Sequence, residues 1–522
     1  MDNSRGGWAL CGLVGTFLLF AALARATPNE TCVSPIQQVD TSHPTTVVGI
    51  GTQESCTEEA LNQALRRGGV ITFDCGGEAT IPITTQKELR VDVDTTLDGQ
   101  AQITLDGSGV TRLLSFAGPG FRYTTTTVTL QNLRLINARA TGTPIPEYPD
   151  EPAQCARGFQ ADAGGAAIFI QDGILHVFNT TFENNRGAPL GPDVGGGAVY
   201  GLGSLEVIVV DSQFIDSSAS NGGAIGALNT DLSVYNSTFD RSAALGHDGE
   251  GYDPDCPWFS KAGSGGAGGA IFIDGGFDLT DVFCGDAFTS SQAGENALGG
   301  AIFRAADLDR QATMFDQCTF DRNLSPRGGG ALFFQNSDLQ ITGSTFTNNS
   351  SFIGGVLQAD TTTLQMENST FANNHTGLAW AVAALFDVQG EFRNCTFVGN
   401  SSAGFAPIVP DFTGVSIENS IFLGNLSVGD TSCDTVNAGW GNLQWPQPVS
   451  AEPNSLSGCV DGVSVGDPVL SDLGDHGGPT STFLPGAGSV ALGLGAGCPQ
   501  IDQRGWPRAD QNACTSGSVE VP

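Results

Sequence analysis

A phenylalanine recurs at nearly constant spacing through the second half of the chain, and this repeat restricts the possible folds more than any other feature. Phe320, Phe346, Phe371, Phe397 and Phe422 follow one another at intervals of 26, 25, 26 and 25 residues. Earlier copies stand at Phe182, Phe214, Phe239 and Phe288. A second mark, Gly-Gly-Ala or a close variant, stands before the units at Gly164, Gly196, Gly222, Gly268, Gly299, Gly329 and Gly354. Self-similarity at this period is typical of a solenoid made of stacked units.

The residues around each phenylalanine predict where a unit runs straight and where it turns. Counting from the phenylalanine, positions −7 and −5 are apolar in most units, and alternation by two is the period of a β-strand with those side chains inward. Asparagine recurs at positions −3 and +3. We expect turns near position −3, because asparagine tolerates turn dihedrals, and we expect stacked amides to hydrogen-bond from one unit to the next.

These units predict an all-β fold, a single-stranded right-handed parallel β-helix over residues 70–425. A unit of about 25 residues with short strands cannot bury its apolar face alone, so units must stack at the strand spacing of ~4.8 Å. The phenylalanines then form an internal ladder, and the glycines turn with positive φ or pack closely. Wider spacing near residues 141–163 and 245–265 predicts two long loops at one corner, and the missing double glycine around Trp380 predicts the weakest register.

The two ends of the chain differ from the repeat. Arg5, an apolar stretch over residues 10–23 and Ala24-Arg25-Ala26 form a signal-peptide pattern over residues 1–26. Residues 27–69 are expected to hold an amphipathic helix at 57–67, with Ser55-Cys56-Thr57-Glu58 as its capping box, that covers the open apolar end. Residues 426–522 are rich in glycine and proline and predict an irregular, disulfide-containing cap or anchor-type region.

Cysteine usage indicates an oxidising compartment. Of the 13 cysteines, all but Cys11 follow the signal peptide, and an even number there favours disulfides over metal sites. Cys56 and Cys75 bracket the helix and the first strand, and we expect them to be bonded to each other. In the C-terminal region the nearest pairings, whose connectivity the spacing leaves open, are Cys433 with Cys459 and Cys498 with Cys514.

The charge of the chain restricts its partners. A formal net charge of −34 argues against polyanionic partners such as nucleic acid or an acidic membrane surface, and it favours solubility and cation binding. No stretch after the signal peptide reaches eighteen uninterrupted apolar residues, so we expect no transmembrane segment in the mature chain. The expected state is a secreted or extracellular monomer, associated with the cell surface or the outer membrane.

The repeat resembles that of a known family. The alternation of "GGAI" or "GGAL" with "FENN", "FTNN" and "FANN" resembles the GGA(I/L/V) and FxxN repeats of the polymorphic outer-membrane protein family, over about residues 130–425. The N-terminal "CTEEALNQAL" and "GGVITFDCGG", with the C-terminal "GDHGGPTSTFLPGAGSVALG" and "CPQIDQRGWPR", resemble bacterial secreted β-helix proteins of the pectin-lyase-like fold that end in a choice-of-anchor Q type region. The first resemblance implies an adhesin, and both imply an extracellular solenoid.

Four charged residues are candidates for catalysis. Enzymes built on β-helices resemble one another in placing catalytic carboxylates, or a basic residue with calcium, on the outward face of stacked strands. Glu367, Arg393 and Glu418 occupy the outward position −4 in consecutive units, and Glu391 lies diagonally at −6. Two carboxylates near an arginine suit general acid and base catalysis of glycoside cleavage. The alternative is a row of ion pairs on a solvated face.

An acidic cluster in the second long loop is the candidate metal site. Asp248, Glu250, Asp253 and Asp255 lie beside two aromatic residues. Carboxylates at this density bind calcium, and aromatic rings stack on sugars. Calcium is therefore the one cofactor for which the sequence offers ligands. The alternative is an acidic loop without a metal, since the spacing is not that of an EF-hand.

Three other sets of residues are interpreted from their place in the repeat. Cys318 and Cys395 both occupy position −2, three units apart, and are expected to be buried free thiols. His176 points outward, and the sequence offers it no carboxylate partner, so we expect it to face solvent. A row at position −1, whose alternatives are an ordinary exposed strand and a sugar- or ice-binding face, consists of Thr181, Thr238, Thr319, Thr345, Thr370 and Thr396.

Together these features favour a secreted or cell-surface β-helix that acts as a non-catalytic, adhesin-like scaffold for an extracellular glycan or a surface protein. One alternative is a polysaccharide lyase or glycoside hydrolase of the pectin-lyase-like fold. Lyases of this fold use lysine or arginine with calcium, and Lys87 and Lys261 are the only lysines in the chain. A second alternative is a purely structural stalk or envelope component.

Overall fold

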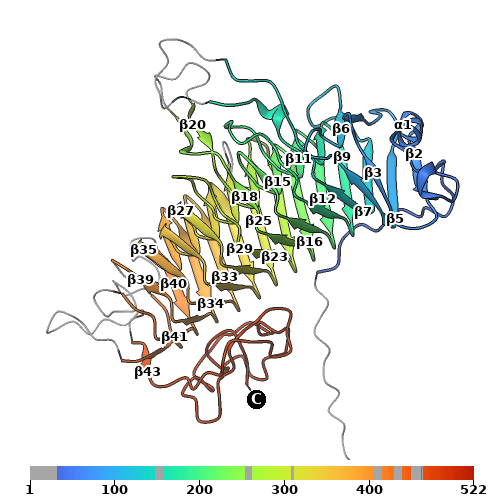
Figure 1. Cartoon of the computed structure of the whole chain (residues 1–522). Coiled ribbons are helices and arrows are strands. Elements are labelled where there is room, and N and C mark those ends of the chain that lie inside the picture. Colours follow the sequence, from blue (N-terminus) through green and yellow to red (C-terminus); the bar gives the residue numbers. More distant parts are fainter. Residues whose placement is uncertain are drawn as a thin grey trace, which may run out of the picture.

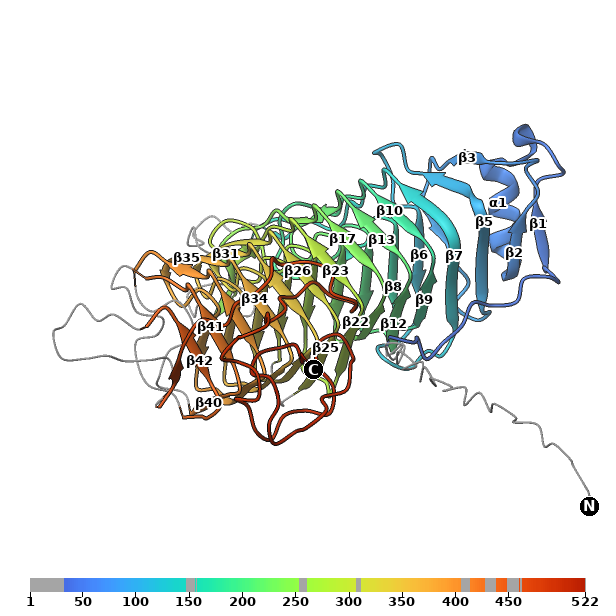
Figure 2. The same cartoon turned by 90° about the horizontal axis from the view of Figure 1, so that it is seen from below.

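The computed structural model describes residues 32–146, 155, 157–252, 261–306, 311–404, 414–427, 438–447, 460 and 462–521. The chain forms an elongated right-handed solenoid of parallel strands, with α1 (Glu58–Arg67) at its N-terminal end (Figures 1 and 2). The all-β, single-stranded parallel β-helix expected from the repeat is therefore confirmed. The predicted signal peptide, residues 1–26, lies outside the described residues.

Each coil contributes strands to three faces. The first face, here called the first ladder, holds the strand that lies just before the turn at position −3. Its members are β1 (Thr46–Val48), β2 (Gly69–Phe73), β9 (Ile174–Phe178), β12 (Glu206–Val210), β16 (Asp231–Tyr235), β22 (Thr280–Cys284), β25 (Gln311–Asp316), β29 (Ser337–Thr342), β33 (Thr363–Glu367), β37 (Gln389–Arg393) and β40 (Val415–Glu418). Two longer strands, β5 (Thr95–Asp106) and β7 (Thr127–Ile136), pass through both this ladder and the next.

The second ladder holds the strand that carries the repeated phenylalanine. Its members are β3 (Ala79–Pro82), β10 (Thr181–Glu183), β13 (Gln213–Ile215), β17 (Thr238–Asp240), β23 (Ala287–Thr289), β26 (Thr319–Asp321), β30 (Thr345–Thr347), β34 (Thr370–Ala372), β38 (Thr396–Val398), β41 (Ile421–Leu423), β42 (Leu443–Trp445) and β43 (Ser464–Val465). The ladder continues past residue 425, where the repeat was expected to end, because β42 and β43 keep the parallel register without the phenylalanine.

The third face is a separate parallel sheet. It is formed by β4 (Lys87–Glu88), β6 (Leu114–Ala117), β8 (Ile168–Gln171), β11 (Val199–Leu202), β15 (Ile225–Leu228), β21 (Ile271–Asp274), β24 (Ile302–Ala305), β28 (Leu332–Gln335), β32 (Leu357–Asp360) and β36 (Ala383–Phe386). Short strands at the remaining corner are β14 (Ser218–Ala219), β18 (Ala243–Ala244), β27 (Leu324–Gly328), β31 (Ser350–Ile353), β35 (His375–Ala379) and β39 (Ser401–Ser402).

The phenylalanines form the internal ladder that their spacing predicts. Phe320 pairs in register with Phe346, and Phe346 with Phe371. Their ring centroids are 4.8 and 5.1 Å apart, with nearly parallel planes. All nine repeated phenylalanines are completely buried, and Leu135 continues the column beside Phe182. The apolar core is therefore one continuous column along the solenoid.

Two columns of polar side chains run beside this core. At position +3, Asn323, Asn349, Asn374, Asn400 and Asn425 are buried, and each of the first four donates its side-chain amide to the side-chain carbonyl of the next at 2.9–3.0 Å. At position −2, the backbone N–H of one coil donates to the side-chain oxygen of the next, as from Cys318 to Ser344 at 3.1 Å. Cys318 and Cys395 are buried free thiols in this second column, as expected.

The repeated glycine pairs have two different roles. The first glycine turns the chain with positive φ, as Gly299 does at φ 73° and Gly329 at φ 65°. The second glycine lies against the backbone of the next coil, because a Cβ on Gly300 would meet the carbonyl oxygen of Gly330 at 1.9 Å. Trp380 takes the first position with φ 60°. The pairing of β31 with β35 shifts register just before it, at Ala379, and β36 then pairs with β32 without a break.

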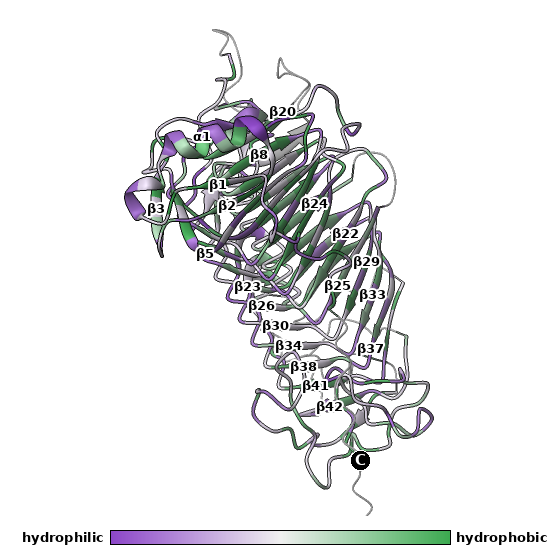
Figure 3. Cartoon of the chain, turned by 90° about the vertical axis from the view of Figure 1, so that its right-hand side faces the viewer, coloured by the Kyte–Doolittle hydropathy of each residue, from purple (hydrophilic) through white to green (hydrophobic). Residues whose placement is uncertain are grey.

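Helix α1 lies across the N-terminal end of the solenoid (Figure 3). Its apolar residues Leu61, Ala64 and Leu65 are buried in the main core. The N-cap is Thr57, whose side chain accepts from the N–H of Ala60 at 3.2 Å. The predicted capping box beginning at Ser55 is wrong, since that residue lies in the preceding 3₁₀ turn η1 (Gln53–Ser55) and the turn sets the helix start two residues later.

The Glu58 carboxylate ties this helix to the strands below it. It accepts hydrogen bonds from the ammonium of Lys87 and from Thr84. Burial alone would raise the pKa of Glu58, but the hydrogen bonds from Lys87 and Thr84 outweigh it and lower the pKa to about 2. Lys87, which the sequence offered only as one of two lysines, therefore anchors the cap.

An N-terminal strap, residues 32–45, runs along the outward face of the first ladder. Cys32 and Cys284 form a disulfide that closes 252 residues, a pairing that the sequence analysis did not predict. Ile36 packs against Phe178 and Val210, which point outward at position −4. These apolar outward side chains were the available signal that something covers this face.

The other disulfides and the two long loops largely agree with expectation. Cys56 is bonded to Cys75, and Cys498 to Cys514, while Cys433 and Cys459 lie outside the described residues.

The two long loops lie close together. The N–H of Arg157, in the first loop, donates to Ser264 in the second at 3.0 Å, so both loops leave the same corner. The second loop contains the antiparallel hairpin of β19 (Gly249–Tyr252) and β20 (Lys261–Gly265), and the first ends near the 3₁₀ turn η2 (Ala161–Ala163). No helix in the part of the chain that the structure describes is long and apolar enough to cross a membrane.

Candidate functional site

The four charged residues that were candidates for catalysis lie together on the first ladder. Glu367, Arg393 and Glu418 pair in register on β33, β37 and β40. The Arg393 guanidinium lies 3.1 Å from Glu391, 3.8 Å from Glu367 and 3.7 Å from Glu418. The structure thus brings all four together, with one arginine among three carboxylates.

Burial makes two of these carboxylates weaker acids. It raises the pKa of Glu367 and of Glu418 above the ordinary value, although Arg393 opposes the shift in both. The Glu418 side chain is only 9% exposed, whereas Glu367 and Glu391 are about one-third exposed at 32% and 29%. A carboxyl with a raised pKa is suited to donate a proton, so the cluster has the residue types of an acid–base site.

The acidic loop is only partly described. Asp248 accepts from His247 at 2.8 Å and from Asn296 at 3.1 Å, and these hydrogen bonds, that of Asn296 first, lower its pKa. Glu250 lies in β19, while Asp253 and Asp255 are outside the described residues, so the calcium site stays a prediction. Another close group of ligand atoms, in Cys32, Cys284 and Asp316, is not a metal site because its two sulfurs are bonded to each other.

His176 has a partner that the sequence analysis missed. Its Nε2 lies 2.8 Å from Oε1 of Glu206, and only 19% of its side chain is exposed, so the expectation of an unpaired, solvent-facing histidine is wrong. The carboxylate belongs to the next coil but is displaced along the strand, since Glu206 pairs with Ile174 rather than with His176. The repeat predicts only partners at directly opposed positions, and it therefore does not predict the pairing of His176 with Glu206.

The row at position −1 on the second ladder divides into an open part and a covered part. In the covered coils Thr345, Thr370 and Thr396 are buried, at 0%, 0% and 2% exposure. The open part, half-exposed or exposed, runs from Thr80 and Thr104 through Arg134, Thr181 and Gln213 to Thr238, and Ala287 then separates it from Thr319. These strands pair in register, so the outward side chains of the open part form one polar stripe along the solenoid.

A C-terminal segment, residues 466–521, covers the row in the last coils. It lies alongside β34 and β41 and does not close the end of the solenoid (Figures 1 and 2). Gln503 accepts from the Thr370 hydroxyl at 2.6 Å and donates to the Thr345 hydroxyl at 2.9 Å. The N–H of Ser518 donates to the Thr396 hydroxyl at 2.9 Å. The threonine row therefore binds amide and hydroxyl groups of the chain itself.

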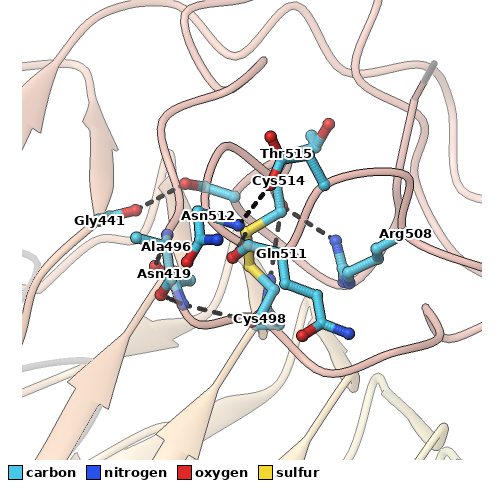
Figure 4. The surroundings of a disulfide bond; sticks show 12 residues. Asn419, Gly441, Ala496, Cys498, Arg508, Gln511, Asn512, Cys514 and Thr515 are labelled. Carbon is cyan, nitrogen blue, oxygen red and sulfur yellow. Dashed lines mark hydrogen bonds between the residues drawn. A yellow bond between two sulfur atoms is a disulfide. The ribbon is translucent and has the colours of Figure 1, made fainter.

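The asparagines at position −3 hold the same segment. Asn419 exchanges two hydrogen bonds with the backbone of Ala496, at 2.9 and 3.0 Å, next to the Cys498–Cys514 disulfide (Figure 4). Arg508 donates to the side chain of Asn368 at 3.0 Å. The sequence predicted this region as an irregular cap, but it gave no indication that the region lies against the side of the repeat.

At the opposite end of the row the surface is hollowed. A pocket of about 540 Å³ is lined by Gln53, Glu78, Thr80, Gln102, Thr104 and Arg134, with two alanines and one isoleucine between them. The Arg134 guanidinium is 56% exposed and lies 2.8 Å from Glu183 on the next coil. The open polar stripe therefore begins in a polar pocket and continues along the second ladder to Thr238.

Comparison with known proteins bears on the fold. Residues 284–429 match the family model described as the right-handed β-helix region. PfbA, a surface adhesin of Streptococcus pneumoniae, is 12% identical, with 81% of this chain and 99% of that chain covered and a TM-score of 0.35. The A-module of the Azotobacter vinelandii mannuronan C-5 epimerase AlgE4 is 9% identical, with 80% and 97% covered and a TM-score of 0.25. No curated protein matches the chain. The family match agrees with the parallel coils described over the same range.

Proposed function

We propose that this protein is an extracellular, non-catalytic β-helix that binds a glycan along the open polar stripe of the second ladder. One observation carries the proposal: in its last coils the same row of threonine hydroxyls is hydrogen-bonded to the hydroxyls of Thr482 and Ser518 and to amide groups of the C-terminal segment. A polysaccharide presents hydroxyl groups in a linear array. The coils of β10, β13 and β17 offer Thr181, Gln213 and Thr238 in the same row, and these side chains remain half-exposed or exposed.

Charge and shape support a glycan as the ligand. The net charge of −34 disfavours polyanions, and side chains that donate and accept hydrogen bonds, such as threonine and glutamine, match neutral hydroxyl groups. The stripe repeats with the strand spacing of ~4.8 Å, so it offers many equivalent contacts to a chain of repeating sugars. The pocket at Arg134 provides a deeper position at one end.

The proposal is tested by measuring binding to a panel of neutral and acidic glycans by isothermal titration calorimetry. Thr238→Arg and Gln213→Arg, made together, place long charged side chains on the open stripe and are expected to weaken binding by at least tenfold, about 1.4 kcal/mol. Gln340→Arg, at an exposed outward position of the first ladder, is the matched control and should bind normally. Binding that is indifferent to the double substitution would refute the proposed surface, and lack of binding to any glycan would favour a structural stalk.

Glycoside cleavage is the second candidate function, because Glu367 and Glu418 have raised pKa values and lie in one cluster with Arg393 and Glu391. A reducing-sugar assay on uronate and neutral glycans separates the two functions. Release of oligosaccharide by the native protein, abolished by Glu391→Gln or Glu367→Gln, would replace the binding function with an enzymatic one. No release from any glycan that binds is the result expected of a scaffold.

A further inference from the structure

Two loops at the corner between the third face and the first ladder display aromatic side chains to solvent. Tyr123 is 82% exposed and Phe277 is 45% exposed, while Phe121 is half-exposed. The rings of Phe121 and Phe277 have centroids 5.9 Å apart, and the Arg122 guanidinium lies over the Phe277 ring at 5.4 Å. We call these three aromatic residues, together with Arg122, the aromatic platform.

The first loop of the platform, residues 118–126, is held by hydrogen bonds of buried Asp172 and half-buried Arg122. The carboxylate of Asp172, a residue with no exposed surface, accepts from the N–H groups of Gly120, Tyr123 and Thr124 at 2.6–2.9 Å, and from the Thr124 hydroxyl at 2.6 Å. Arg122 donates to the backbone carbonyls of Ser204 and Asn229 at 2.9 and 2.8 Å. Tyr123 is thus presented by a fixed loop and not by a loose one.

The second loop, residues 275–279, is held from inside the solenoid. Gln311 donates to the carbonyl of Phe277 and accepts from Arg304, which is completely buried and paired with buried Asp281 at 3.1 Å. Arg304 stands in a column otherwise occupied by apolar residues such as Ile273 and Phe334. Burying a charged pair in an apolar core carries a large desolvation cost, and here the hydrogen bonds among Asp281, Arg304 and Gln311 offset it and hold the loop at Phe277.

The geometry points to a second binding site on this protein, in which the aromatic platform stacks against the sugar ring of a neutral oligosaccharide. Three side chains, each able to bury about 150–250 Å² when fully covered, are too few for the roughly 800 Å² that each partner buries in a stable protein complex. They match one or two sugar rings. Arg122 is neutralised by Asp231 at 3.0 Å, so the platform offers no free positive charge to an acidic sugar.

This site goes beyond the proposed function, because the corner is a different surface from the second-ladder stripe. Arg122 contacts the turns before β12 and β16, whereas the stripe is formed by β10, β13 and β17 on the far side of the bend. A glycan chain bound at one of these surfaces is therefore not required for binding at the other. The two inferences can fail separately.

The test uses the full mature protein with cellohexaose, xylohexaose and chitohexaose as probes and tetragalacturonate as the acidic comparison, measured by calorimetry. Tyr123→Ser and Phe277→Ser are each expected to weaken binding of at least one neutral probe about tenfold, while Tyr123→Trp retains it. Phe352→Ser, which removes another half-exposed aromatic ring from β31, is the matched control and should bind as the native protein does. Unchanged thermal unfolding of each variant shows that the fold is retained.

The outcomes separate the platform from the stripe. Loss of binding in the Tyr123 and Phe277 variants but not in the Thr238→Arg, Gln213→Arg variant supports the platform. The reverse pattern overturns the platform and leaves the proposed function intact. A platform that serves a protein partner binds none of the neutral probes, and that result, or preferential binding of tetragalacturonate, overturns the inference as well.

Discussion

The side-chain amide of Asn349 donates to the side-chain carbonyl of Asn374, one coil further on, at 3.0 Å, and the backbone N–H of Asn349 donates to the same oxygen. Asn374 in turn donates to the Phe346 carbonyl at 3.0 Å and to Asn400 at 2.9 Å. Asn323, Asn349, Asn374 and Asn400 thus each hydrogen-bond to both neighbouring coils. The column fixes the register by hydrogen bonds, while the phenylalanines fix it by stacking.

Asn374→Ala should therefore be strongly destabilising. The substitution removes the acceptor of two buried N–H groups of Asn349 and one donor to the Phe346 carbonyl, and we expect the free energy of unfolding to fall by about 3 kcal/mol. Asn348→Gly is the control, since Asn348 has φ 56° at the surface and glycine accepts that conformation readily. Denaturant unfolding of both variants measures the difference. Equal stabilities would show that the column does not hold the coils in register.

Gly300→Ala tests the contact that explains the second glycine of each pair. Gly300 has an ordinary φ, but its Cβ would lie 1.9 Å from the Gly330 carbonyl oxygen, so the neighbouring coil must move. We expect a loss of roughly 3 kcal/mol, the upper part of the range for overpacking. Gly474→Ala adds the same methyl group where nothing lies within 4 Å and should leave the unfolding midpoint unchanged.

The solenoid was predictable because its inward positions are dictated by the coil itself. A side chain at the phenylalanine position stacks on its equivalents in the coils above and below, so the 25-residue period predicts the ladder. The ionic cluster was predictable for the same reason, since Glu367, Arg393 and Glu418 are directly opposed. The strand register predicts that these residues lie together, but it does not predict whether they catalyse a reaction.

The segments that cover the solenoid could not be predicted in this way. Cys32 meets Cys284, and Gln503 meets Thr370, across more than one hundred residues without any repeat in the covering segment. Only the covered surface can be recognised in the sequence, where apolar residues stand at outward positions, as Phe178 and Val210 do beneath the N-terminal strap. A threonine row gives no such indication, because threonine suits both an exposed strand and a covered one.

Asp286 makes stability depend on pH. It occupies position −2 and is completely buried, and burial raises its pKa well above the usual value. Its Oδ1 accepts from the N–H of Ser237 at 2.7 Å, while Oδ2 has no hydrogen-bond partner. Asn442 occupies the same position near the end of the ladder, where its Nδ2 donates to the Ile417 carbonyl at 2.7 Å. A protonated Asp286 can donate to the previous coil in the same way.

The folded protein thus holds the Asp286 proton to higher pH than the unfolded chain, whose aspartate pKa is about 3.9. Stability from this group is complete below pH ~4 and is lost as pH rises toward the folded pKa. We expect Asp286→Asn to stabilise the protein more at pH 8 than at pH 5, because asparagine donates at every pH. Denaturant unfolding at the two pH values gives the difference. A stabilisation that is the same at both would mean that Asp286 is ionised in the fold.

Removing the Cys32–Cys284 disulfide should release the N-terminal strap. The bond closes a loop of 252 residues, for which the chain-entropy model gives a stabilisation of roughly 5 kcal/mol. In the double variant Cys32→Ser, Cys284→Ser we expect a lower unfolding midpoint and binding of a hydrophobic dye, because Phe178 and Val210 lose the cover of Ile36. Cys318→Ser is the control, since serine already occupies the equivalent position at Ser344, and it should leave both readouts unchanged. If dye binding stays at the native level in the double variant, the strap is held by its own contacts and the disulfide only joins its end.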